Sequence, residues 1–218
     1  MIEVFLLSLI QGVTEFLPIS SSSHLALFAE YLEFENQGLS LDVSLHIGSF
    51  FAVVFYFFKD IINFFENKSL FTKILVSSLP VMIVGFFLIE TGLINKIRNI
   101  QTIAWTTFIF AILLYISDKF KLDKKIKNNF TFKAAILIGL FQILSLMPGA
   151  SRSGIAITAA RILNYKREDS AKISFLLSIP ILGAVSIFGI QNIMFSENLN
   201  FTTTNVIAII FSFFFSFI

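Results

Sequence analysis

The stretch QGVTEFLPISSSSH, residues 11–24, decides how this chain folds, because it sets a cluster of polar side chains inside otherwise apolar sequence. Pro18 lies near its middle and stops the helix predicted over about residues 3–17. At about 1.5 Å per residue, that helix reaches about 22 Å, short of the roughly 30 Å hydrocarbon core of a bilayer. With a second short helix over about residues 22–31, the stretch predicts a re-entrant hairpin, which enters the membrane and turns back.

A second stretch, PGASRSGIAIT at residues 148–158, repeats this plan between helices predicted over 133–147 and 151–163. The two stretches share the pattern Pro-x-x-Ser-x-Ser, and Gln11 and Gln142 lie nearly in register upstream of it. Three apolar runs separate the hairpins, so the second should open toward the opposite membrane face. The sequence therefore predicts two inverted repeats, an arrangement in which binding sites lie near the bilayer midplane.

The composition is that of an integral membrane protein. Hydrophobic residues make up 56% of the 218 residues, 29 of which are Phe, and the mean hydropathy is +0.85. Apolar runs that cross or nearly cross a bilayer cover about 43–58, 70–94, 101–117, 173–195 and 203–218. We therefore predict an all-α polytopic membrane protein with a single integral membrane domain over 1–218. Repeat 1 covers about 1–117 and repeat 2 about 133–218.

Lys and Arg concentrate in three loops, at 59–73, 118–133 and 161–172. By the positive-inside rule these loops are cytoplasmic, which puts the first hairpin and the N-terminus outside. The lysine-rich 118–133 loop is interpreted as a topology determinant that can touch anionic membrane lipids, not as a nucleic-acid site. The sequence contains no Cys, which excludes disulfides and thiolate metal sites.

Gln11 and Glu15 lie four residues apart and so share one face of the first helix. Their oxygens suit a general base or a site for a hard cation, Mg²⁺ or Ca²⁺, with a diphosphate completing the coordination. The alternative is a pair that only faces a water-filled vestibule. The nearby serines and histidine favour the functional interpretation.

Four serines, at 20–23, follow Pro18 and open the second helix, where free backbone N–H groups make an anion site. One serine would suffice to cap the helix. His24 lies within a turn of these serines and can act as an acid or base, with Glu15 fixing its tautomer. His46 lies in an apolar run and is interpreted as a hydrogen-bonded packing residue.

Arg152 stands between Ser151 and Ser153 at the start of a predicted helix, where guanidinium, hydroxyl and backbone N–H groups can all face a phosphate. The alternative is an arginine that snorkels to the membrane interface, which a buried tip disfavours. Gly149 allows the backbone to approach a ligand closely.

At these two stretches the sequence resembles the undecaprenyl-diphosphate phosphatase family, the bacitracin-resistance type of bacterial membrane enzyme. Residues 11–24 are similar to the family's [Glu/Gln]-x-x-x-Glu motif with its following serines and histidine, and residues 148–158 to its Pro-Gly-x-Ser-Arg-Ser-x-x-x-x-Thr pattern. The resemblance covers essentially the whole chain. It implies hydrolysis of undecaprenyl diphosphate to undecaprenyl phosphate and inorganic phosphate, which recycles the lipid carrier for cell-wall synthesis.

The resemblance also implies roles for individual residues. Gln11 and Glu15 serve the metal or base site, His24 acts as the acid or base, and Arg152 clamps the phosphate. Ser21 is the nucleophile or orients an attacking water, and this alternative stays open. The implied phosphate pocket is lined by Ser20, Ser22, Gly149, Ser151 and Ser153.

The implied location is the bacterial cytoplasmic (inner) membrane, with the active site facing the outer side. Partners are the polyprenyl diphosphate substrate and membrane lipids, and the oligomeric state is open, with a homodimer as one alternative. Relatives usually continue beyond the apolar run in which this chain stops, so we expect a truncated C-terminus. The competing function is a transporter or flippase of a polyprenyl phosphate lipid, since transport needs phosphate binding but no nucleophile.

Overall fold

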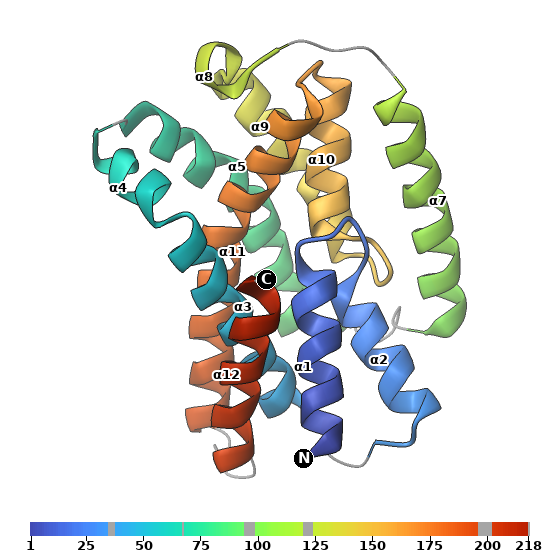
Figure 1. Cartoon of the computed structure of the whole chain (residues 1–218). Coiled ribbons are helices and arrows are strands. Elements are labelled where there is room, and N and C mark those ends of the chain that lie inside the picture. Colours follow the sequence, from blue (N-terminus) through green and yellow to red (C-terminus); the bar gives the residue numbers. More distant parts are fainter. Residues whose placement is uncertain (35–37, 67, 94–98, 120–123, 196–201, 218) are drawn as a thin grey trace. The chain divides into compact units, whose positions relative to one another are not determined.

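The computed structural model describes residues 1–34, 38–66, 68–93, 99–119, 124–195 and 202–217, which are mostly helical and contain no β-strand (Figure 1). The helices that follow the predicted plan are α1 (Ile2–Glu15), α2 (Ser21–Tyr31), α3 (Leu39–Tyr56), α5 (Lys68–Glu90), α7 (Ile100–Asp118), α9 (Phe132–Gln142) with the 3₁₀ turn η1 (Ile143–Leu146), α10 (Arg152–Ile162), α11 (Arg167–Phe195) and α12 (Thr203–Phe217). The predicted all-α class is confirmed.

Three of the described helices are long and apolar enough to cross a membrane: Lys68–Glu90, Ile100–Asp118 and Arg167–Gln191. Shorter apolar helices cover Ser40–Tyr56, Phe132–Leu146 and Thr203–Phe217. Large apolar side chains on α7, among them Trp105 and Phe108, are more than half exposed. Such a surface suits lipid, and the protein is a membrane protein.

The chain forms two compact units. Unit 1 contains Met1–Phe16, Ser21–Phe58 and Ser178–Ile218, and unit 2 contains Leu17–Ser20 and Lys59–Leu177. Helix α11 contributes to both units, and the turn after α1 groups with unit 2. Each predicted repeat contributes to both units, and the repeat boundaries stay a prediction.

Unit 1 is built on close contacts between α1, α3 and α12, which lie side by side in Figure 1. Gly12 on α1 faces the backbone of Phe215, and Gly48 on α3 faces Ile209 and Ser212. A β-carbon at either glycine would collide with α12, so the helices approach as small-residue helix pairs do in membranes. Leu25 of α2 joins the buried cluster that includes Leu7 and Leu45.

In unit 2, α10 is the most enclosed helix. Eight of its eleven residues are buried, and it packs against α7 and α9. Gly139 of α9 faces the backbone of Ser77 on α5, so these two helices also approach closely. The start of α10, where the second polar stretch lies, is therefore surrounded by protein.

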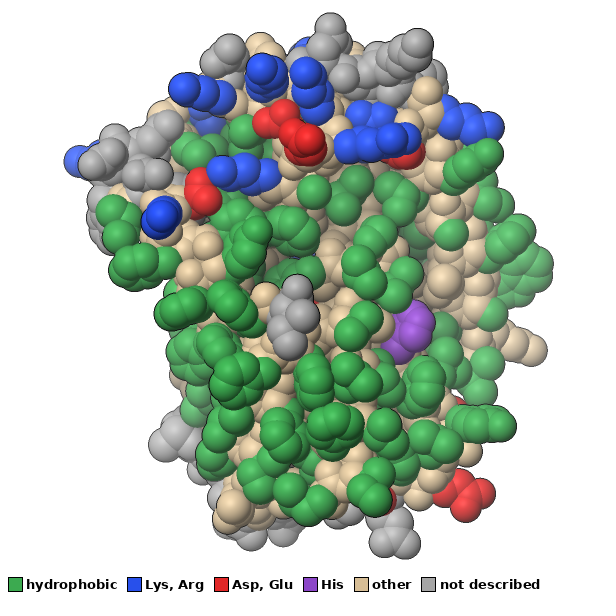
Figure 2. All heavy atoms as spheres, viewed as in Figure 1, with side chains coloured by type: hydrophobic (Ala, Val, Ile, Leu, Met, Phe, Trp, Pro, Cys, Tyr) green, Lys and Arg blue, Asp and Glu red, His purple; other side chains and the backbone are tan. Residues whose placement is uncertain are grey.

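The three basic loops meet at one end of unit 2. Lys172 Nζ lies 2.7 Å from Asp60 Oδ1, Arg167 Nη2 lies 2.6 Å from Asp118 Oδ2, and Lys124 pairs with Tyr165 in an isolated β-bridge. Figure 2 shows Lys and Arg side chains gathered at the end of unit 2 that carries α8. The positive-inside count predicted that these loops share a side; which side is cytoplasmic stays a prediction.

Two short helices lie in these loops and were not predicted, namely α4 (Phe58–Glu66) and α8 (Ile126–Asn129). Both occur where charged residues interrupt the apolar runs. A hydropathy count therefore reads these segments as loop.

Candidate active site

Gln11 and Glu15 lie one turn apart on α1, and both side chains are buried. Gln11 Nε2 donates a hydrogen bond of 3.0 Å to Glu15 Oε2. The prediction that they share a helix face is confirmed. The amide thereby orients a carboxylate that is only 7% exposed.

Ser21, the first residue of α2, donates a hydrogen bond of 2.6 Å to the same oxygen, Glu15 Oε2. The contact exists because α1 ends at Glu15 and the intervening turn brings the chain back before α2 begins. A hydroxyl this close to a carboxylate makes a short, charge-assisted hydrogen bond. The pair has the arrangement of a serine nucleophile beside a general base.

His46 of α3 also lies near this carboxylate. Its Nε2 is 3.9 Å from Glu15 Oε2, and its Nδ1 lies 2.8 Å from the carbonyl oxygen of Asp42. The predicted hydrogen-bonded character of His46 is confirmed, but its closeness to Glu15 was not predicted. The residues lie 31 positions apart in the sequence, and no local pattern brings them together.

A group of serine hydroxyls contacts the Gln11 amide. Gln11 Nε2 also approaches Ser49 Oγ at 3.3 Å, and Ser49 Oγ lies 3.2 Å from Ser212 Oγ and 2.8 Å from Ser216 Oγ. These serines come from α3 and α12 and were missed in the sequence analysis. Their signal is faint, since single serines in apolar helices usually bond back to their own helix.

The predicted cation site stays a prediction. Among the residues that the structure describes, no three His, Cys, Asp or Glu side chains come together as metal ligands would. The donor set is thus one carboxylate, from Glu15, and one amide oxygen. Gln11 Oε1 is buried and lacks a hydrogen-bond partner within the described part of the chain. An oxygen of this kind fits a hard cation that takes its other ligands from a diphosphate.

In unit 2, the start of α10 holds the turn of the first polar stretch. Ser151 caps the helix, accepting a hydrogen bond of 3.1 Å from Gly154 N, and its Oγ lies 3.0 Å from Ser153 Oγ. Ser153 Oγ donates to the carbonyl oxygen of Leu17 at 2.5 Å. The turn at residues 17–20 and the second polar stretch therefore lie together in unit 2.

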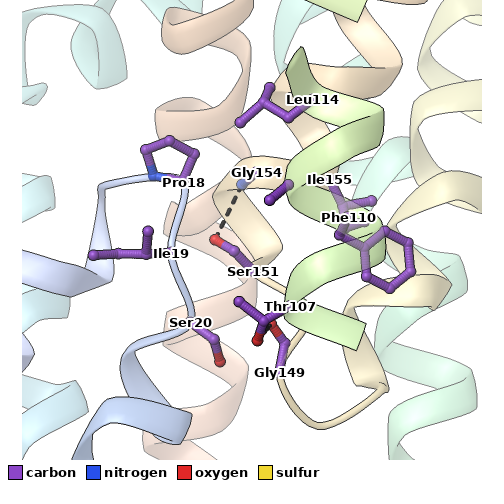
Figure 3. Close-up of a pocket in the computed structure, with 11 residues that line it drawn as sticks. Pro18, Ile19, Ser20, Thr107, Phe110, Leu114, Gly149, Ser151, Gly154 and Ile155 are labelled. Atoms are coloured by element: carbon purple, nitrogen blue, oxygen red, sulfur yellow. Dashed lines mark hydrogen bonds between the residues drawn. The ribbon is translucent and has the colours of Figure 1, made fainter. Parts of the chain in front are cut away.

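A pocket of about 60 Å³ lies beside these residues. Figure 3 shows the turn residues Pro18, Ile19 and Ser20 on one side, α7 on the other, and Ser151 between them. Hydroxyl groups line part of the wall, and the α7 side contributes apolar side chains such as Phe110. The volume holds several waters or a small polar group.

Gly149 adopts a φ of +92°, in the left-handed region that glycine tolerates. Its would-be β-carbon points at Thr106 and the backbone of Ile103. Thr107 Oγ1 donates to the Gly149 carbonyl oxygen at 3.0 Å, and Thr106 Oγ1 donates to that of Pro148. Two threonines in an apolar helix were not singled out from the sequence, yet they hold the second turn.

The structure thus groups the predicted residues into two sets. Gln11, Glu15 and Ser21 come together in unit 1, and Ser20, Gly149, Ser151 and Ser153 in unit 2. His24 is partly buried one turn into α2, Arg152 is the partly buried first residue of α10, and Ser22 is exposed. Their functional roles stay predictions.

The sequence is similar over most of its length to bacterial proteins named Undecaprenyl-diphosphatase. It is 48% identical to the Undecaprenyl-diphosphatase of Pelagibacter ubique (strain HTCC1062), covering 99% of this chain and 84% of that protein. It is 37% identical to the Undecaprenyl-diphosphatase of Jannaschia sp. (strain CCS1), covering 96% and 84%. The sequence pattern of the family described as Bacitracin resistance protein BacA matches residues 4–218. The chain therefore belongs to the BacA family.

Proposed function

We propose that this protein hydrolyses undecaprenyl diphosphate to undecaprenyl phosphate and inorganic phosphate. The observation that carries the proposal is the 2.6 Å hydrogen bond from Ser21 to Glu15, a hydroxyl beside a buried base, in a chain whose relatives are named Undecaprenyl-diphosphatase. The reaction returns a lipid carrier for cell-wall synthesis and accounts for bacitracin resistance in the family. A transporter of the same lipid would need no such pair.

Glu15 serves as the general base in either of two routes. In the first, Ser21 Oγ attacks the terminal phosphorus, its proton passes to Glu15, the bond to the bridging oxygen breaks, and water then hydrolyses the phosphoserine. In the second, Ser21 orients a water whose proton passes to Glu15 as the water attacks. Both routes consume one water and release one phosphate.

Arg152 and the start of α10 are proposed to bind phosphate. A guanidinium at the first residue of a helix adds its charge to the free N–H groups there, and Ser151 and Ser153 add hydroxyls. His24 lies within one turn of Ser21 on α2 and is proposed as the acid that protonates the leaving phosphate oxygen.

Gln11 and Glu15 are proposed to hold Mg²⁺ or Ca²⁺. When bound, the cation would supply electrostatic stabilisation of the negative charge on the diphosphate. Two observations support this assignment. Gln11 Oε1 is buried and lacks a hydrogen-bond partner within the part of the chain that the structure describes. Gln11 and Glu15 also share one face of α1, where Gln11 Nε2 contacts the carboxylate.

The finer topology is also a proposal. Helices α1 and α2, and α9 and α10, are proposed as two re-entrant hairpins of inverted repeats. Two observations support it: each pair is short and joined by an irregular turn, and Gln11 and Gln142 are both fully buried near the ends of their first helices. The protein would lie in the bacterial inner membrane with its active site toward the outer side. A homodimer is a further proposal, and the mass of the solubilised protein tests it.

Phosphate release from undecaprenyl diphosphate by the purified protein in detergent, with Mg²⁺ or Ca²⁺, tests the proposal. Wild type should release phosphate, whereas Ser21→Ala and Arg152→Ala should not. Ser69→Ala, at an exposed position near the start of α5, is the matched control and should behave as wild type. Folded wild-type protein that binds the lipid and moves it across vesicles without phosphate release would instead establish the transporter.

A further inference from the structure

We propose that Ser49 of α3 is a positioning residue that fixes which way the Gln11 amide is turned. In this orientation the amide nitrogen faces acceptors of the protein, and Oε1 is the atom left for a ligand. The inference rests on the proposed function, because it concerns the part of Gln11 in the proposed cation site. It adds residues of α3 and α12 that neither polar stretch contains.

The Gln11 side chain is fully buried, and its amide nitrogen carries two hydrogens. Nε2 lies 3.0 Å from Glu15 Oε2 and 3.3 Å from Ser49 Oγ. A carboxylate oxygen only accepts hydrogen bonds, so the amide atom that faces Glu15 is the nitrogen and not Oε1. Glu15 takes one hydrogen and Ser49 the other, and both donors of the buried amide are thereby satisfied.

Ser49 can accept this hydrogen bond because its own hydrogen has partners on α12. A serine hydroxyl can donate or accept, so its neighbours decide which it does toward Gln11. Ser212 Oγ donates its one hydrogen to the carbonyl oxygen of Leu45 at 2.6 Å. Ser212 Oγ is therefore an acceptor toward Ser49 Oγ, 3.2 Å away, and Ser216 Oγ lies 2.8 Å from the same hydroxyl. The Ser49 lone pairs remain for the amide.

Glu15 alone would hold the amide firmly only while its carboxylate is ionised. As the proposed general base it takes up a proton, and as a cation ligand it shares a lone pair, and either event weakens its attraction for the Gln11 N–H. The contact with Ser49 does not depend on the charge of Glu15. Ser49 therefore keeps the nitrogen turned inward and leaves Oε1, which has no hydrogen-bond partner within the described part of the chain, as the cation ligand.

Three substitutions at Ser49 separate hydrogen bonding from packing. Ser49→Ala removes the acceptor, Ser49→Cys keeps nearly the same size with a much weaker acceptor, and Ser49→Thr keeps the hydroxyl. Ser44→Ala is the matched control. Ser44 is also a fully buried serine of α3 that links to α12, but its hydroxyl contacts are with Ser40 and Asn205.

The first measurement is hydrogen exchange of the two Gln11 Nε2 protons, followed by NMR on substrate-free protein that carries nitrogen-15 glutamine. The Gln11→Glu variant lacks these signals and so identifies them. We expect exchange to be about 3- to 10-fold faster in Ser49→Ala and Ser49→Cys, because one N–H loses its acceptor. Ser49→Thr and Ser44→Ala should match wild type.

The second measurement is the Ca²⁺ concentration that gives half the maximal rate of phosphate release, with thermal unfolding in parallel. Ser49→Ala and Ser49→Cys should raise this concentration by about 10-fold, as the loss of a residue that orients a metal ligand does, and saturating Ca²⁺ should restore the rate. Ser44→Ala should lower the Tm and leave the Ca²⁺ dependence unchanged, because it affects packing alone.

Equal exchange at Gln11 in Ser49→Ala and in active wild type would overturn the inference, and so would equally fast exchange in Ser44→Ala. Faster exchange with an unchanged Ca²⁺ dependence would also overturn it, since the amide would then be oriented for no cation. Should wild type release no phosphate, the proposed function fails, and the role of Ser49 fails with it. The exchange measurement needs neither substrate nor cation, so these failures are distinguishable.

Discussion

Ser21 Oγ and Glu15 Oε2 lie 2.6 Å apart across the turn that ends α1 and begins α2. The two residues are six positions apart, and the turn between them belongs to the other compact unit. The catalytic pair that we propose therefore depends on how the turn at residues 17–20 is held.

Replacing Glu15 by Gln should lower kcat for phosphate release by about 10²- to 10⁴-fold, the range for loss of a general base. Gln has nearly the same shape and still accepts a hydrogen bond from Ser21, so the folded state should persist. Phosphate release and thermal unfolding in detergent are the measurements. A variant that keeps more than about a third of the wild-type rate would remove Glu15 from the chemistry.

Replacing Ser153 by Ala should loosen the turn of the first stretch, because the Leu17 carbonyl oxygen loses its 2.5 Å hydrogen bond. We expect a loss of about 1 kcal/mol in stability and faster hydrogen exchange at residues 19 and 20. Ser145→Ala is the control, since the Ser145 hydroxyl donates to the carbonyl oxygen of Gln142, three residues earlier, and not to the turn. Equal exchange in the two variants would contradict the assignment.

Replacing Gly149 by Ala should cost more than replacing Gly92 by Ala. Both glycines have a positive φ, +92° and +65°, so each substitution carries backbone strain of roughly 1 kcal/mol or more. At Gly149 the new methyl group would meet Thr106 and the backbone of Ile103, whereas at Gly92 no atom of the described residues lies within 4 Å of it. We expect loss of activity and a clearly lower Tm for Gly149→Ala alone. Similar Tm values for both variants would show that the second turn can move.

Replacing Arg161 by Leu should destabilise the basic end of unit 2 by roughly 2 kcal/mol, because backbone carbonyl oxygens lose a buried donor and the partly exposed Asp118 loses a partner. Arg161 is 4% exposed, lies 3.2 Å from Asp118 Oδ1, and donates to the carbonyl oxygens of Tyr165 and Asp118. Arg167→Ala removes the exposed partner of the same Asp118 and should change the Tm little. Chemical denaturation of both variants measures the two losses in unfolding free energy. A larger loss for Arg167→Ala than for Arg161→Leu would contradict the prediction.

The helices were predictable where the apolar runs are long. The run at 101–117 became Ile100–Asp118, and the run at 203–218 became Thr203–Phe217. The end of the first helix was predictable because proline disfavours helix in the residue before it, and α1 ends at Glu15, shortly before Pro18. The polar loops gave no such signal, which is why α4 and α8 were missed.

Within the candidate site, contacts between sequence neighbours were predictable and contacts between distant segments were not. Helical spacing placed Gln11 over Glu15, and the serine run placed a hydroxyl near them. The positions of His46 and Thr106 depend on how α3 and α7 pack, and that packing leaves no mark in the local sequence.

In the turns at residues 17–20 and 148–150, backbone carbonyl groups accept hydrogen bonds from side-chain hydroxyls of the protein itself. In a soluble protein, water would satisfy the carbonyl groups of such irregular backbone. Here Ser153, Thr106 and Thr107 supply that hydrogen bonding from neighbouring helices. Hydroxyl groups of neighbouring helices are one of the means by which irregular backbone in a membrane protein finds hydrogen-bond partners. An isolated serine or threonine on an otherwise apolar helix can therefore indicate a nearby turn whose backbone it hydrogen-bonds. The turn itself can lie far away in the sequence.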